Sequence, residues 1–268
     1  MPHFLRTRRP NRPRTKRPDA LKKLRPVNRL IESDLIRHVD FDAYRHEVRK
    51  VYAGPKGALL STASLLSLHT MLSERWLRKR KFDVSGAKKI LDVGSGAGQI
   101  ALHMLKYANP DAEITCCDLS WQMLRRARNR LFAKARSLQR VSYRRRVSDG
   151  LPGVQHVVAD ISVLPFENES FDCITCGYVL EHLPDARLGL SELSRVLQPG
   201  GRLLLLTTED NFGGAWTSRL WRCRTYNRDE LQRISQELGL TWKKELWFSP
   251  LHRRVRAGGI CVEIEKAA

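Results

Sequence analysis

From residue 88 onward, short apolar segments alternate with segments of helical periodicity, and this alternation restricts the possible folds more than any other feature of the chain. Strands are expected at 89–93, 113–118, 155–159, 171–177 and 201–207. Helices are expected at 99–107, 121–135 and 186–197. Strands joined through helices lie parallel, and helices then cover both faces of the sheet. The sequence therefore predicts an α/β, doubly wound fold.

The C-terminal part departs from this alternation. Asn227 is expected to cap a helix that ends at Leu238. Two strands, at 241–248 and 259–265, follow with no helix expected between them, so they should pair as an antiparallel hairpin at the sheet edge. With the five earlier strands they make a seven-stranded, mostly parallel, Rossmann-like sheet with an antiparallel C-terminal hairpin.

The N-terminal part is expected to be helical after a basic tail. Helices are predicted at 31–49 and 59–80, with a break at 54–57. We therefore divide the chain into a tail at 1–30, a helical cap at 31–87 and the main domain at 88–268.

The formal net charge of +20 is concentrated in two tracts. Residues 1–30 hold eleven Lys or Arg against Asp19 alone, and prolines interrupt them, so this tail is expected to be disordered. Residues 125–146 hold ten Lys or Arg and no acid. Weak contact with an anionic membrane surface, contact with RNA and a purely solubilising role are all compatible with this charge.

The apolar segments are too short for a membrane-spanning helix or a signal peptide, so we expect a cytoplasmic protein, with peripheral contact at the inner membrane surface as an option through the tail. Six cysteines are present, of which Cys173 and Cys176 form a C-x-x-C pair. Because no second pair stands at a zinc-binding spacing, the sequence favours buried free thiols in strands and predicts no metal site.

A glycine-rich turn, Gly94 to Gly98, joins the first strand to the following helix. Adenosine-containing ligands bind at such turns in open α/β sheets. The glycines do not follow the G-x-G-x-x-G dinucleotide pattern, and Asp92 would repel a pyrophosphate but suits an amino group. Asp118 ends the next strand, where a carboxylate can accept from both ribose hydroxyls. The backbone amides of Ser95 and Gly96 are expected to face the ligand.

Six short motifs occur in a fixed order: LDVGSGAG at 91–98, DLS at 118–120, AD at 159–160, LPF at 164–166, FD at 171–172 and LQPGG at 197–201. In order and spacing they resemble the motif series of the class I S-adenosylmethionine-dependent methyltransferases. Within that superfamily the chain is similar to the branch that contains the ubiquinone and menaquinone methyltransferases. The resemblance covers about residues 88–206 and implies a methyltransferase with S-adenosyl-L-methionine as its cofactor.

By position, the resemblance also implies the cofactor-binding residues Asp92, Gly94, Ser95, Gly96, Gly98, Asp118, Leu119, Met123, Asp160 and Ile161. Asp92 and the glycine turn would hold the methionine part, and Asp118 the ribose diol. Met123 and Ile161 would lie against adenine, and Asp160 would accept from the adenine amino group. Met123 could equally be a core residue. Asp118 and Asp160 could instead serve as helix caps.

On the acceptor side, Tyr178 and His182 follow the fourth strand, whose carboxyl end faces the ligand crevice. The Asn/Asp-Pro-Pro-aromatic turn of base amino methyltransferases is absent, and Cys176 is followed by glycine instead of the proline of pyrimidine C5 methyltransferases. Proximity and orientation of the two reactants can supply much of the rate acceleration in methyl transfer. If a base is used, His182 is the candidate, although Glu181 and His182 could instead cap the next turn. Tyr178 is a candidate for lining the transfer channel, with a core role as the alternative.

The segment 209–226 contains four aromatic residues, Phe212, Trp216, Trp221 and Tyr226, beside a Gly-Gly pair. They could form a lid over a flat or apolar acceptor, or they could pack into the core. Three functions remain open. The first is methylation of a small-molecule, quinone-like or lipid-like acceptor; the second is methylation of RNA held by the two basic tracts. The third, a non-catalytic scaffold, is disfavoured by the complete set of cofactor residues.

Overall fold

The computed structural model of the chain describes residues 68–142, 153–211, 214, 223–255 and 258–268. The basic tail, the helix predicted at 31–49 and the first part of the helix predicted at 59–80 lie outside these residues, as does the end of the second basic tract. The remainder of the predicted 59–80 helix is present as α4 (Leu68–Arg78).

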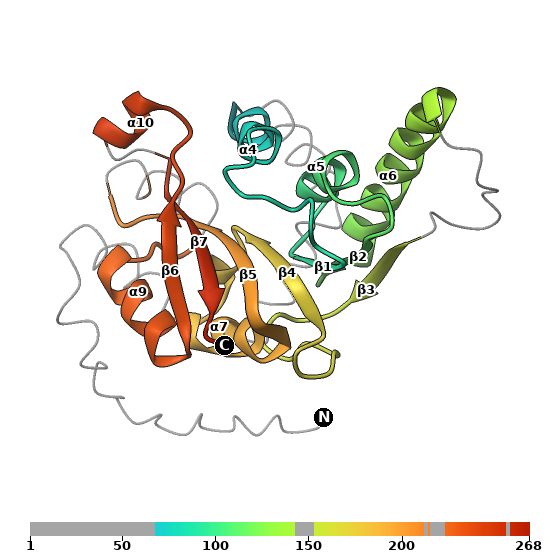
Figure 1. Ribbon diagram of the computed structural model, residues 1–268. Coiled ribbons are helices and arrows are strands. Elements are labelled where there is room, and N and C mark those ends of the chain that lie inside the picture. Colours follow the sequence, from blue (N-terminus) through green and yellow to red (C-terminus); the bar gives the residue numbers. More distant parts are fainter. Residues whose placement is uncertain (1–67, 143–152, 212–213, 215–222, 256–257) are drawn as a thin grey trace, which may run out of the picture.

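A seven-stranded sheet forms the centre of the structure, in the order β3-β2-β1-β4-β5-β7-β6 (Figure 1). Its strands are β1 (Lys89–Val93), β2 (Glu113–Asp118), β3 (Val154–Val158), β4 (Phe171–Gly177), β5 (Leu197–Thr207), β6 (Leu240–Glu245) and β7 (Ile260–Lys266). The first five pair in parallel, whereas β7 runs antiparallel to both β5 and β6. The predicted doubly wound fold with an antiparallel C-terminal pair is therefore confirmed.

Helices cover both faces of this sheet (Figure 1). The face bearing α4 also carries α5 (Gln99–Tyr107) and α6 (Trp121–Ser142), and the opposite face carries α7 (Ala186–Val196) and α9 (Arg228–Glu237). Alternation along β1 sends Ile90 into the hydrophobic cluster on the α5 side, and Leu91 and Val93 into the cluster on the α7 side. The buried apolar area on both faces holds the strand ends in fixed positions.

Several helices and strands begin or end at residues other than those predicted. Helix α6 continues to Ser142 instead of ending at residue 135, because the basic residues of this tract are good helix formers. Strand β3 starts one residue earlier, and β5 starts at Leu197. The expectation of no helix between the last two strands was wrong. A five-residue helix, α10 (Pro250–Arg254), lies there, with the Ser249 side chain accepting from the His252 amide and Pro250 in the first turn.

The six cysteines are free and buried, as predicted. Five of them lie in β2, β4 and β7, and Cys223 lies outside the strands. Within the described part of the chain, no helix is both long and apolar enough to cross a membrane.

Candidate functional site

The turn after β1 can be built only with glycine at its key positions. Gly94, Gly96 and Gly98 have φ angles of 65°, 51° and 81°, in the left-handed region that other residues rarely adopt. A Cβ atom on Gly94 would lie 2.0 Å from Val179 Cγ2, and one on Gly98 would lie 3.0 Å from Ala127 Cβ. The turn is therefore pressed between the segment after β4 and helix α6, and its backbone is the surface left for a ligand.

Asp118, at the end of β2, is bonded to this turn. Its Oδ2 accepts the Gly96 amide at 2.9 Å, and its Oδ1 accepts the Ser120 amide at 2.8 Å. The Ser95 amide donates to the Cys117 carbonyl at 3.0 Å. The expectation that the Ser95 and Gly96 amides face the ligand was therefore wrong, because the end of β2 lies close enough to use both. Each Asp118 oxygen still has acceptor capacity for a hydroxyl.

Asp92 lies beneath the turn, on the α5 side of the sheet. Its side chain is 1% exposed, and Thr175 Oγ1 on β4 donates to its Oδ1 at 2.7 Å. Its Oδ2 has no hydrogen-bond partner among the residues that the structure describes. Burial, together with the nearby charge of Asp118, raises the pKa of Asp92 to about 7. A buried carboxylate with one unused oxygen is costly to ionise unless positive charge is brought close to it.

Three residues were expected at adenine, namely Asp160 and Ile161 after β3 and Met123 on α6. Asp160 Oδ1 accepts from the Ser162 amide at 2.8 Å and from its hydroxyl at 2.7 Å, so it closes a tight turn. Ile161 is 6% exposed, and its Cδ1 lies 3.2 Å from the Cβ position of Gly189 on α7. Met123 is also buried, with its sulfur 3.2 Å from Arg126 Nη1. The side chains of Met123 and Ile161 thus pack in the protein interior, and their contact with adenine stays a prediction.

The acceptor-side candidates stand directly after β4. Tyr178 has a φ of 57°, a strained value for a non-glycine residue, and its amide donates to the Leu206 carbonyl on β5 at 2.8 Å. The residue is 39% exposed. His182 ends the short 3₁₀ helix η2 (Leu180–His182), and burial lowers its pKa to about 4. The imidazole is therefore neutral at physiological pH. The helix that follows, α7, is capped by Asp185, whose side chain accepts the Arg187 amide.

Glu181 was not selected from the sequence as a site residue, although the structure gives it a definite role. It is 2% exposed, and its Oε1 accepts the Thr208 amide at 2.7 Å and the Thr208 hydroxyl at 3.0 Å. Burial raises its pKa to about 7. In addition, the Tyr226 hydroxyl donates to the Leu180 carbonyl at 2.6 Å. These bonds tie η2 to the residues that follow β5. In the sequence, this role of Glu181 was signalled by its position as a carboxylate within the mainly apolar segment 179–183.

Tyr226 is buried, in agreement with the alternative that the aromatic residues of segment 209–226 pack into the core. Phe212, Trp216 and Trp221, the other candidates for a lid, lie outside the described residues. Leu119 is half-buried beside Asp118. The structure thus brings together Asp92, the glycine turn and Asp118, with Tyr178 and His182 following the neighbouring strand β4.

Residues 91–205 match the methyltransferase domain family. Demethylmenaquinone methyltransferase of Thermus thermophilus is 37% identical over 135 residues, which is 49% of this chain and 53% of the relative. The ubiquinone/menaquinone biosynthesis C-methyltransferase of Teredinibacter turnerae is 30% identical over 135 residues, or 49% of each chain. The chain therefore spans about half the length of the curated relatives that it matches.

The fold is also similar to that of geranyl diphosphate C-methyltransferase from Streptomyces coelicolor, solved with S-adenosyl-L-homocysteine. The TM-score is 0.52 at 15% identity, covering 72% of this chain and 76% of the other. The strand order, the glycine turn, the carboxylate after β2 and these matches agree with one another. Residues 91–205 therefore carry a methyltransferase domain that is similar to those of the class I S-adenosylmethionine-dependent methyltransferases.

Proposed function

We propose that this chain transfers a methyl group from S-adenosylmethionine to a small-molecule acceptor of quinol-like or lipid-like character. The observation that carries the proposal is the turn at Gly94–Gly98, bonded to Asp118 across the adjoining ends of β1 and β2. This arrangement offers a ligand the backbone of the glycine turn and the Asp118 carboxylate. The Asp92 Oδ2 atom, which has no hydrogen-bond partner among the described residues, lies behind them. Such a surface suits a ligand that carries both a diol and positive charge.

The residues present fit this cofactor at its ribose and methionine ends. Asp118 would accept from the ribose hydroxyls, and Gly96 leaves space beside them, because the nearest atom to a Cβ there would be the Gly94 carbonyl oxygen at 3.9 Å. Asp92 would offset the positive charge of the methionine end, and its pKa of about 7 permits ionisation at neutral pH when a cation is near. Asp160, at the neighbouring strand end, would accept from the adenine amino group. When bound, the cofactor supplies an activated methyl group on a sulfonium.

The chain's own contribution to transfer is placement of the acceptor and, where the acceptor loses a proton, its removal. Tyr178 is partly exposed at the end of β4, with its backbone held by the Leu206 carbonyl. His182 is neutral because burial lowers its pKa to about 4, so it can accept a proton but is a weak base. Orientation therefore contributes more than basicity in this proposal.

The activities of two matched relatives support a quinol-like acceptor, since one is a demethylmenaquinone methyltransferase and the other a ubiquinone/menaquinone biosynthesis C-methyltransferase.

A labelled-methyl assay tests the proposal. The full-length chain is incubated with methyl-labelled S-adenosylmethionine and, in separate reactions, a short-chain 2-substituted naphthoquinol, a benzoquinol, phospholipid vesicles and total RNA. Label in a quinol is the expected result, and it should fall to background with Asp118→Asn but persist with Asp111→Asn, which changes an exposed aspartate. Label in RNA alone would overturn the small-molecule proposal while leaving the methyltransferase assignment intact.

A further inference from the structure

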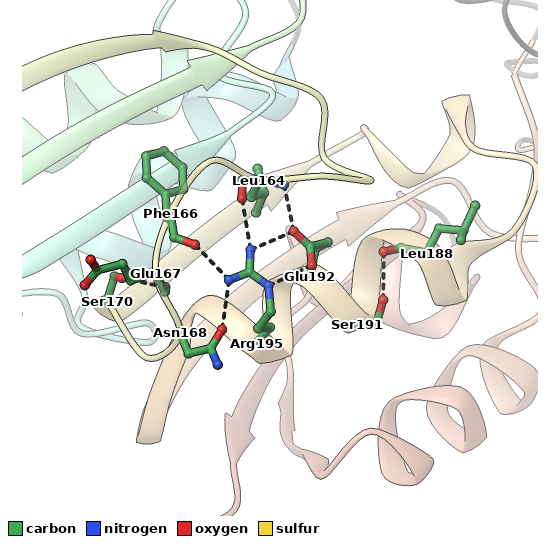
Figure 2. Close-up of polar contacts among 9 residues, drawn as sticks. All are labelled: Leu164, Phe166, Glu167, Asn168, Ser170, Leu188, Ser191, Glu192 and Arg195. Atoms are coloured by element: carbon green, nitrogen blue, oxygen red, sulfur yellow. Dashed lines mark hydrogen bonds and ion pairs between the residues drawn. The ribbon is translucent and has the colours of Figure 1, made fainter.

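The segment between β3 and β4 is held on helix α7 by one ion pair, as Figure 2 shows. Arg195 donates from Nη1 to the Phe166 carbonyl at 2.7 Å and from Nη2 to the Leu164 carbonyl at 2.9 Å. Glu192 Oε2 accepts the Leu164 amide at 2.7 Å. The amide and the carbonyl of Leu164 are therefore both hydrogen-bonded to this ion pair. Arg195 Nη1 also donates to Asn168 Oδ1 at 3.0 Å.

The ion pair is itself well formed. Arg195 Nε and Nη2 donate to the two Glu192 oxygens, each at 2.8 Å. The Glu192 and Arg195 side chains are only 17% and 31% exposed. The hydrogen bond from Arg195 lowers the pKa of Glu192, so the carboxylate stays ionised at neutral pH. A planar guanidinium can reach two carbonyls and a carboxylate at once, whereas a lysine ammonium lacks this fixed fork.

The same segment is continuous with the turn that carries Asp160. The Val163 amide donates to the Asp160 carbonyl at 3.0 Å, directly before Leu164. Ile161 packs onto α7 at Gly189, where a Cβ would lie 3.2 Å from Ile161 Cδ1. Residues 160–166 are thus attached to α7 at an apolar point near their start and at the ion pair near their end. A shift at Leu164 should therefore also shift the Asp160 carboxylate.

We propose that Arg195 and Glu192 are positioning residues for the adenine end of the cofactor. They lie on α7 and act through Leu164 and Phe166, which set the place of Asp160. The inference rests on the proposed function, because it takes Asp160 to meet adenine. It extends that function by assigning part of the cofactor affinity to a pair on the outer helix layer.

The test compares ligands that share adenosine but differ at the other end. Binding of S-adenosylhomocysteine and of 5′-methylthioadenosine is measured by calorimetry for the wild-type chain, Arg195→Gln, Arg195→Lys and Glu192→Gln. The matched control is Arg187→Gln on the same helix, which breaks an exposed ion pair with Glu237. We expect Arg195→Gln to weaken both ligands by the same factor, roughly tenfold, as for other networked positions without direct ligand contact. Arg195→Lys should be intermediate, and Arg187→Gln should change binding less than about twofold.

Hydrogen exchange of the unliganded proteins gives a readout that does not depend on the cofactor. Amides of residues 160–166 should exchange faster in Arg195→Gln than in wild type or Arg187→Gln, while those of β1 should not change. Wild-type affinity and exchange in both Arg195→Gln and Glu192→Gln would overturn the inference. So would a loss confined to S-adenosylhomocysteine, because it would place the effect at the methionine end. If the wild-type chain binds neither ligand, it is the proposed function that fails.

Discussion

Binding of S-adenosylmethionine should be linked to loss of a proton from Asp92. The carboxylate is 1% exposed, its Oδ2 is without a partner in the described part of the chain, and its pKa is raised to about 7. A cation placed nearby stabilises the ionised form, so the protonated enzyme must release this proton before the full attraction develops. The affinity should therefore fall as the pH drops below 7.

The size of the effect follows from that pKa. If the bound-state pKa lies well below the range tested, the apparent dissociation constant scales as 1 + 10^(pKa − pH). Between about pH 7.0 and 5.5 this gives a weakening of roughly sixteenfold, or ~1.6 kcal/mol. The range stays below the ordinary α-amino pKa of about 7.7 to 8.0, so a ligand amino group remains protonated throughout.

The assay is titration calorimetry at each pH, repeated in two buffers with different ionisation enthalpies so that proton release is counted directly. Asp92→Asn should bind more weakly at pH 7 and lose most of the pH dependence, whereas Asp111→Asn, at an exposed position, should behave as wild type. Equal wild-type affinity at both pH values, or a full pH dependence in Asp92→Asn, would show that Asp92 does not release a proton on binding.

Two further predictions concern packing and stability. Gly94→Ala should abolish S-adenosylhomocysteine binding and cost about 1 to 3 kcal/mol of unfolding free energy, because its Cβ would lie 2.0 Å from Val179 Cγ2. Gly86→Ala, whose Cβ would have no atom of the described residues within 4 Å, is the control in urea denaturation, and equal effects of the two substitutions would contradict the packing argument. Burial raises the pKa of Glu181 from 4.5 to about 7, so the stability linked to its protonation is present below pH 4.5 and lost as the pH rises through 7. Thermal unfolding of the unliganded chain should accordingly show a smaller loss between about pH 5 and 8 for Glu181→Gln than for wild type, and parallel curves would count against this account.

Most of the fold could be predicted because strand and helix periodicities are local. The bounds of β1, α5, β2 and β4 came out as predicted, since short apolar runs there are closed by glycines or polar residues. Helix α10 was missed because five residues are too few for a periodic pattern, although Ser249 and Pro250 were present as a cap and first-turn signal.

The site could be predicted less completely because it depends on contacts between strand ends. The motif order located Asp118 and the glycine turn. It did not reveal that the Asp118 carboxylate accepts a hydrogen bond from the Gly96 amide. Nor did it reveal the bond of Glu181 to Thr208, which lies 27 residues away in the sequence. The ion pair of Glu192 and Arg195 was not predicted either, although the two residues stand three apart on a helix, and the carbonyls that the pair binds lie in a distant segment of the sequence.

The ends of β1 and β2 should bind S-adenosylmethionine, and calorimetric binding of S-adenosylhomocysteine to wild type, Asp118→Asn and Asp111→Asn at pH 7 tests this site. Saturable one-to-one binding is expected, and Asp118→Asn should weaken it by at least about tenfold, since a charged acceptor of ribose hydroxyls is lost, whereas Asp111→Asn should leave it unchanged. Binding of equal strength by all three proteins, or by none of them, would contradict this expectation.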